Sequence, residues 1–167
     1  PVISTNTQLN QKLELLNEIG SISKTGGWEV DLASGVITWT DEMFRIYGLP
    51  HGSPVSISTA MAYFPPETKK AITASFDKVV REGKEYCHEG FLRRADGKVL
   101  RIKATGKPRY TGKKVTQVFG ALEDITEQYR LLETEYNYAA YLTAILDNLN
   151  DVVVTIDTSG TIITANK

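Results

Sequence analysis

The stretch YCHEGFLRRADGKVLRIKATGKPRYTGKKVTQVFGALED, residues 86–124, decides the fold class of this chain. Apolar and polar residues alternate along it with a period of two, as in β-strands. Two turn signals, Ala95-Asp96-Gly97 and Tyr110-Thr111-Gly112, divide it into three parts. Three consecutive strands are therefore expected, over residues 86–94, 99–107 and 115–123.

The middle strand indicates how the sheet is oriented. Leu100, Ile102 and Ala104 share one face of it, and the opposite face carries Arg101, Lys103, Thr105 and Lys107. One face of the sheet should therefore lie on a core, and the other should be polar.

Two more strands are expected upstream. Residues 28–32 and 36–39 alternate around the turn Ala33-Ser34-Gly35, which predicts a β-hairpin. Asp41 can cap a short helix that carries Met43, Phe44, Ile46 and Tyr47. A longer helix is expected from Pro66 to just before Gly83, with Ile72, Phe76 and Val79 or Val80 buried. Two strands, helices and three strands predict an α+β fold, a five-stranded antiparallel sheet with helices on one face.

Amphipathic helices are expected on both sides of this unit. Over residues 1–25, apolar residues return every three or four positions at Leu9, Leu13, Leu16, Ile19 and Ile22. This helix could pack on its own domain or on a second subunit. Asp124-Ile125-Thr126-Glu127 marks the start of a second helix in the linker segment of residues 126–150; running to about Asn148, it would be on the order of 33 Å long. Its apolar stripe, which includes Leu132 and Leu146, extends beyond the domain and so requires a partner helix or a following domain.

Residues 151–167 resemble the first hairpin. Ser159-Gly160-Thr161-Ile162 corresponds to Ser34-Gly35-Val36-Ile37, and Asn166 falls where Asp41 does. We interpret residues 151–167 as the truncated start of a second copy of the fold, and the chain as a fragment of a tandem array.

Composition narrows the class of protein. The chain has 167 residues, 41% hydrophobic and 23% charged, with 19 Lys and Arg against 20 Asp and Glu, so no global charge favours nucleic acid. Basic residues do gather between Arg93 and Lys114, but we expect them to face solvent or a helix. A single cysteine, Cys87, excludes an internal disulfide. No apolar run reaches the roughly 20 residues of a membrane span, and a cytoplasmic location is expected, although a longer protein could carry an anchor.

Several motifs together resemble the PAS family, in particular the subgroup that opens with Gly-Gly-Trp-Glu. The matching motifs are Gly26-Gly27-Trp28-Glu29, residues 39–48 (WTDEMFRIYG), residues 93–97 (RRADG) and residues 120–127 (GALEDITE). Two departures from the subgroup's pattern are Arg101, where an aromatic residue is common, and Gly90-Phe91, in place of an aromatic-arginine pair. These departures affect details of the pocket or interface, and they leave the fold unaffected.

The resemblance implies a non-catalytic sensory domain over residues 26–125. The domain would bind a small ligand or mediate homodimerisation through its flanking helices. Its C-terminal helix would carry the signal to an output domain, such as a histidine kinase or a cyclic-di-GMP GGDEF/EAL enzyme. Asp124, Thr126, Leu132 and Leu146 are the candidates for signal transmission. The alternative is a constitutive dimerisation scaffold with a filled core and no ligand.

The resemblance also implies a cavity, and strand parity suggests which residues could line it. The candidates are Trp39, Phe44, Tyr47, Phe76, Tyr86, His88, Leu92, Ile102, Val118 and Leu122. Any one of them could instead fill the core. His88 is notable because a polar ring on an inward face needs a hydrogen-bond partner.

The cofactor remains unknown from the sequence. Haem-binding relatives use a histidine on the long helix, where this chain has none, and flavin photosensors use an Asn-Cys-Arg motif there, whereas Cys87 lies on a strand. His51 and His88 lack a second ligand at metal-binding spacing, so no metal is expected. Cys87 and His88 are neighbours on a strand and point to opposite faces, which argues against a catalytic pair. A phosphate-binding loop follows a strand and opens a helix, whereas Gly26-Gly27 follows a helix and enters a strand, so no such loop is expected.

Overall fold

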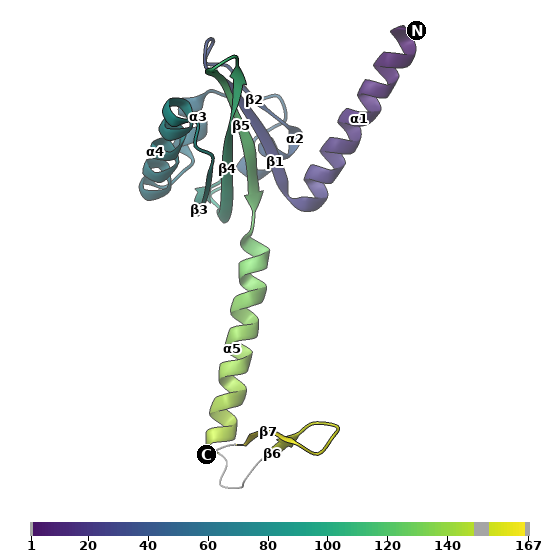
Figure 1. The fold of residues 1–167 in the computed structure, drawn as a ribbon, viewed down its shortest axis with the longest axis vertical. Coiled ribbons are helices and arrows are strands. Elements are labelled where there is room, and N and C mark those ends of the chain that lie inside the picture. The colour runs from purple at the N-terminus through teal and green to yellow at the C-terminus, as the bar shows by residue number, and fades with distance from the viewer. Residues whose placement is uncertain (1, 149–153, 166–167) are drawn as a thin grey trace. The chain divides into compact units, whose positions relative to one another are not determined.

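A computed structural model describes the backbone of residues 2–148 and 154–165, and the side chains of residues 7–145 and 154–163 (Figure 1). The chain forms two compact units, Pro1–Thr126 and Glu127–Lys167. The first unit contains α1 (Val2–Ser23), β1 (Thr25–Asp31), β2 (Ile37–Trp39), α2 (Asp41–Tyr47), α3 (Ile57–Ala62), α4 (Pro66–Glu82), β3 (Tyr86–Arg93), β4 (Val99–Thr111) and β5 (Lys114–Asp124). The second contains α5 (Thr126–Asn148), β6 (Val154–Ile156) and β7 (Ile162–Ala165).

The first unit is built on one five-stranded antiparallel sheet, in the order β2-β1-β5-β4-β3. The first hairpin and the last three strands meet where β1 pairs with β5, with Trp28 opposite Gly120. This arrangement confirms the predicted α+β fold. Strand β4 continues to Thr111, beyond the expected Lys107, because its pairing with β5 extends to the turn after a register shift between Arg109 and Tyr110.

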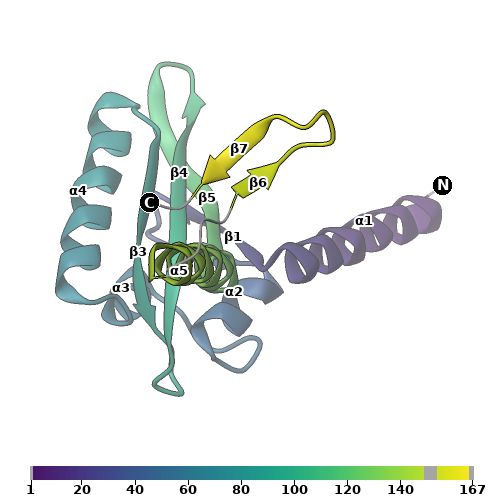
Figure 2. The ribbon, with the colours of Figure 1, turned by 90° about the horizontal axis from the view of Figure 1, so that it is seen from below.

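One face of the sheet packs on the core, as the alternation predicted. Leu92, Leu100, Ile102 and Val118 are at most 1% exposed, whereas Arg101 and Lys103 lie on the other face and are half-buried. Helices α2, α3 and α4 gather on the core side, and Figure 2 shows α4 running along the edge formed by β3. Burying these side chains supplies most of the stabilisation of the fold.

Helix α2 starts differently from the prediction. Its N-cap is Thr40, in an extended conformation, and Asp41 is the first helical residue. The expected cap by Asp41 is therefore wrong by one position. Its carboxylate remains favourable at the positive end of the helix and bonds instead to side chains of other segments.

Helix α3 was not predicted. The hydroxyl of Ser56 accepts a hydrogen bond from the backbone N–H of Thr59 and so caps it. Helix α4 begins and ends as expected, with Pro66 in its first turn and Gly83, in the left-handed conformation, after its last residue. Ile72 and Val79 are buried, and Phe76 is half-buried.

Candidate ligand cavity

A cavity of about 600 Å³ lies between the sheet and helices α2–α4 in the first unit. The strands contribute Trp28, Val30, Ile37, Trp39, Tyr86, Ala104 and Leu122 to its wall. The helices and the loop before α4 contribute Met43, Tyr47, Ile57, Ser58, Ala60, Met61, Phe64, Lys69, Ile72, Thr73, Phe76 and Asp77. The volume falls in the range of small-molecule sites, which are concave and mostly apolar.

Aromatic rings form much of the cavity wall. The ring centroids of Trp39 and Tyr47 are 4.5 Å apart, and Tyr47 packs edge-on against Tyr63 at 5.3 Å. Across the wall, the rings of Trp28 and Phe76 are 6.4 Å apart. These distances are typical of favourable aromatic pairs, so packed aromatic rings form two parts of the wall.

Three aromatic side chains of this wall carry a hydrogen-bond donor: the hydroxyls of Tyr47 and Tyr86 and the indole N–H of Trp39. Burial raises the pKa values of both Tyr47 and Tyr86, so both hydroxyls stay protonated. Among the described residues, the buried indole N–H of Trp39 has no hydrogen-bond partner.

Five of the ten predicted cavity residues line this space: Trp39, Tyr47, Phe76, Tyr86 and Leu122. The others lie outside the described wall. Leu92, Ile102 and Val118 are buried, and Phe44 packs against Trp39 and His51 at centroid distances of 5.3 and 5.4 Å. His88 is half-buried on the same face of β3 as Tyr86 and Leu92.

Sequence reasoning missed part of the wall. Trp28 and Val30 lie two residues apart on β1 and therefore share one face, so strand parity could have placed both in the wall. Ile57, Ala60 and Met61 belong to α3, whose only local signal is the capping Ser56. Short helices with one cap are difficult to identify from sequence alone.

Two of the predicted signal-transmission residues lie at the boundary between the units. Asp124 Oδ1 accepts a hydrogen bond of 3.0 Å from the backbone N–H of Thr126. The hydroxyl of Thr126 accepts one of 2.9 Å from the backbone N–H of Arg101, on the neighbouring strand β4. The first residue of α5 is thereby attached to the sheet. Leu132 is 60% exposed on α5, and the side chain of Leu146 lies outside the described residues.

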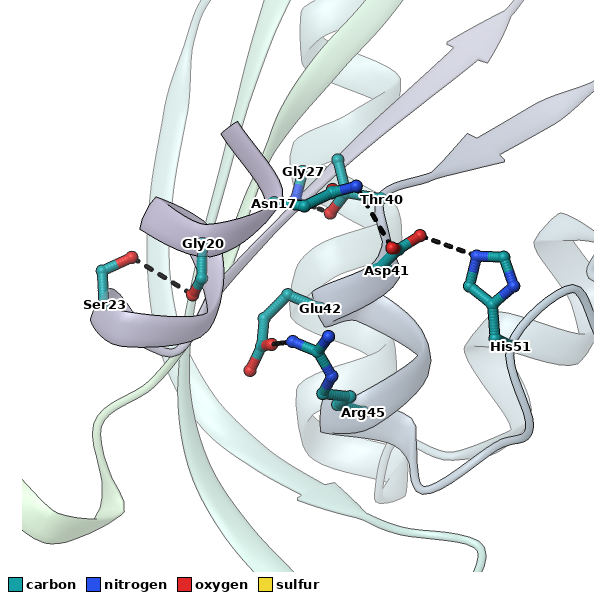
Figure 3. A network of polar contacts seen from close by, with 9 residues as sticks. All are labelled: Asn17, Gly20, Ser23, Gly27, Thr40, Asp41, Glu42, Arg45 and His51. Carbon is teal, nitrogen blue, oxygen red and sulfur yellow. Dashed lines mark hydrogen bonds and ion pairs between the residues drawn. The ribbon is translucent and has the colours of Figure 1, made fainter. Parts of the chain in front are cut away.

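A polar network attaches α1 to α2 (Figure 3). The Asn17 side-chain amide donates to Asp41 Oδ2 at 3.1 Å, and the other carboxylate oxygen of Asp41 lies 2.7 Å from His51 Nε2. Met43 and Tyr47 on the same helix line the cavity. Helix α2 thus contacts both the cavity and the N-terminal helix.

Many of the basic side chains between Arg93 and Lys114 contact residues of this domain. Arg109 Nη1 lies 2.6 Å from Glu29, and its guanidinium is 4.7 Å from the ring centroid of Phe119. Lys107 pairs with Glu85 at 2.9 Å. These contacts neutralise part of the basic surface.

The described residues contain no group of three or more His, Cys, Asp or Glu side chains that could hold a metal ion. The thiol of Cys87 is exposed, while His88 lies on the inward face of the strand. Among the residues that the structure describes, no helix is long and apolar enough to cross a membrane.

Residues 36–122 match the family model described as the PAS fold, which is just over half of the chain. This chain belongs to the PAS family. PAS domains are sensory and non-catalytic modules, and the match covers only that region. It begins at Val36, after Gly26-Gly27-Trp28-Glu29, so the subgroup remains a prediction. No curated protein is similar enough to count as a match.

Solved structures share this fold at low sequence identity. An RNA-binding light-oxygen-voltage receptor superposes with a TM-score of 0.61 and 19% identity over 74% of this chain, which spans only 34% of that receptor. A sensory box histidine kinase/response regulator from Burkholderia thailandensis superposes with a TM-score of 0.59 and 17% identity; the match covers 76% of this chain and 96% of that one. The N-terminal domain of a diguanylate cyclase with a PAS/PAC sensor from Marinobacter aquaeolei superposes with a TM-score of 0.57 and 16% identity; the match covers 63% of this chain and 98% of that one.

Proposed function

We propose that this domain senses a small molecule in its cavity and transmits the change through α5 to an output domain in the same polypeptide. The output would be a histidine kinase or a GGDEF/EAL enzyme of cyclic-di-GMP metabolism. Related structures come from a histidine kinase and a diguanylate cyclase, which supports these two classes. The working form would be a homodimer.

The cavity is the observation that carries the proposal. A filled core would leave voids little larger than a water molecule, whereas about 600 Å³ adjoins the buried side chain of Tyr47. The unpaired indole N–H of Trp39 in its wall is costly unless a ligand or water satisfies it.

The attachment of Thr126 to β4 supports the route to α5. Ile102 and Ala104 on β4 are core residues, and Ala104 lines the cavity. A change in the wall could therefore shift the strand that holds the first residue of α5, and coupling requires such a physically connected element with two arrangements.

Exposed apolar stripes on both flanking helices support the homodimer. Leu13, Leu16 and Ile19 on α1 are more than half exposed, as are Leu131 and Leu132 on α5. Apolar stripes at helical spacing are the usual basis of helix pairing.

Native mass spectrometry of the purified protein, followed by small-molecule extraction, tests the sensing step. We expect a bound or exchangeable small molecule in the wild type, and its loss in Ala104→Phe, which places a ring in the cavity. Thr105→Phe, on the opposite face of β4, is the control and should retain binding. An empty wild type that takes up no compound from a broad ligand screen would favour the constitutive scaffold.

The transmission step is tested in the full-length protein. Leu132→Glu should abolish ligand control of output activity, because a charge on the stripe disrupts helix pairing. Asn137→Glu, outside the predicted stripe, should leave that control intact. Unchanged control in Leu132→Glu would contradict transmission through α5.

A further inference from the structure

The distribution of charge around the cavity limits what it can hold. Of its described wall residues only Lys69 and Asp77 are charged, and both are exposed on α4. An anion or cation deep in this space would lose its hydration without gaining a counter-charge, which is strongly unfavourable. This excludes phosphate-bearing and polyanionic ligands from the enclosed part.

The hydrogen-bond donors of the wall limit the ligand from the other direction. The buried indole N–H of Trp39 has no partner among the described residues, and the hydroxyls of Tyr47, on α2, and Tyr86, on β3, belong to the same wall. Both hydroxyls stay protonated, because burial raises pKa values that already lie well above neutral pH. A purely hydrocarbon occupant would leave the Trp39 donor unsatisfied, at a cost greater than that of an unfilled acceptor.

The aromatic wall favours a ligand that contains a flat ring. The indoles of Trp28 and Trp39 and the rings of Phe64 and Phe76 offer flat, weakly polar faces. Such faces favour stacked or edge-on contact with another ring.

We infer that the ligand of this cavity is a neutral, mainly apolar ring compound with a carbonyl or ether oxygen that accepts a hydrogen bond from Trp39, Tyr47 or Tyr86. This inference rests on the proposed ligand-sensing function and specifies its chemistry. The oxygen satisfies a buried donor, and the rings of the ligand fill the aromatic part of the wall.

Three probes of matched size test the inference by calorimetry on the whole chain. They are 2-acetylnaphthalene, which has a neutral acceptor, 2-ethylnaphthalene, which has none, and 2-naphthoate, which is an anion. We expect 2-acetylnaphthalene to bind about five-fold more tightly than 2-ethylnaphthalene, the ratio of one net hydrogen bond. The naphthoate should bind most weakly.

Trp39→Phe, Tyr47→Phe and Tyr86→Phe identify the donor, because each removes one N–H or O–H group and keeps an aromatic ring. In one of them the preference for 2-acetylnaphthalene should disappear while the affinity for 2-ethylnaphthalene is unchanged. That unchanged affinity also shows that the variant is folded.

The contrary outcomes separate the inference from the proposed function. Equal affinities for the acetyl and ethyl compounds in the wild type, with water satisfying the donors, would overturn the inference and leave ligand binding intact. So would tightest binding of 2-naphthoate, lost in Lys69→Gln. Failure of all three probes to bind would also overturn the inference, while ligand sensing itself is decided by the extraction and ligand screen described above.

Discussion

Two hairpins of this chain have turns of similar composition and differ in what surrounds them. In β1–β2, Asp31 Oδ1 accepts hydrogen bonds from the backbone N–H and the hydroxyl of Ser34, and Gly35 has a φ of 69°. In β6–β7 the aspartate lies one residue closer to the serine: Asp157 Oδ1 accepts bonds from the backbone N–H and the hydroxyl of Ser159, and Gly160 has a φ of 86°. An aspartate, a serine and a left-handed glycine thus close both turns, although the two turns differ in length by one residue.

Their surroundings are different. Strand β1 also pairs with β5 and places Val30, only 3% exposed, in the core. Strands β6 and β7 pair only with each other among the described residues, and Ile156 and Ile162 are about 60% exposed. A turn signal is thus sufficient for hairpin geometry, but a core requires further strands and helices. This supports our proposal that residues 151–167 begin a second copy.

The largest loss of stability is expected from a substitution that disrupts the strands packed around the first hairpin. In Gly120→Ala, the new Cβ would collide with the carbonyl oxygen of Thr105 and approach the Trp28 ring, at the centre of the sheet. We expect the free energy of unfolding to fall by more than about 4 kcal/mol, measured by urea denaturation. Gly112→Asn, at an exposed turn with open space around it, is the control. A cooperative transition near the wild-type midpoint would contradict this register.

A matched isoleucine pair tests the difference in burial directly. Ile37→Ala removes a side chain that packs on the core and lines the cavity, so it should cost about 2 kcal/mol. Ile162→Ala, at the corresponding position of the second hairpin, should change the same transition by less than about 0.5 kcal/mol. Equal costs would mean that the second hairpin also has a core.

The turn itself should matter less than the packing. Gly35→Ala forces a Cβ into the left-handed conformation and should cost about 1 kcal/mol. Gly35→Asn should be nearly neutral, because asparagine tolerates that conformation. Gly160→Ala should not move the melting temperature of the first unit. Calorimetric melting of the three variants tests this ranking, and a larger loss in Gly35→Ala than in Ile37→Ala would reverse it.

The smallest expected effect is on how the stability of the fold depends on pH, through the aspartates of the two turns. Hydrogen bonds from Ser34 hold the pKa of Asp31 below its ordinary value of 3.8, and bonds from Ser159 do the same for the pKa of Asp157. A lowered folded-state pKa adds stability that is present above the unfolded value and is lost as the pH falls through the folded one.

Melting of the first unit should therefore become slightly less pH-dependent below about pH 4 in Asp31→Asn. Asp157→Asn should leave that dependence unchanged. Carboxyl titration by NMR would locate both pKa values, and ordinary values in both turns would exclude the hydrogen bonds described.

Much of the architecture was predictable because it depends on local periodicity. The alternation around Leu100 and Ile102, the turn at Asp96-Gly97 and the stop at Gly83 reflect interactions among residues close in the chain, and all are found in the structure. The cavity was less predictable. Parity places Tyr86 and Leu92 on the same face, but only packing determines that Tyr86 borders an open space and Leu92 does not.

The sequence by itself determined the strands, the main helices, the turns and the α+β class, because hydrogen bonding and side-chain period act over a few residues. Only the tertiary structure decided that β1 lies beside β5, that Asp41 bonds to Asn17 and His51, and that an aromatic-walled space remains under α2–α4. Those features join residues distant in the chain. They depend on how whole elements pack, which no single stretch of sequence specifies.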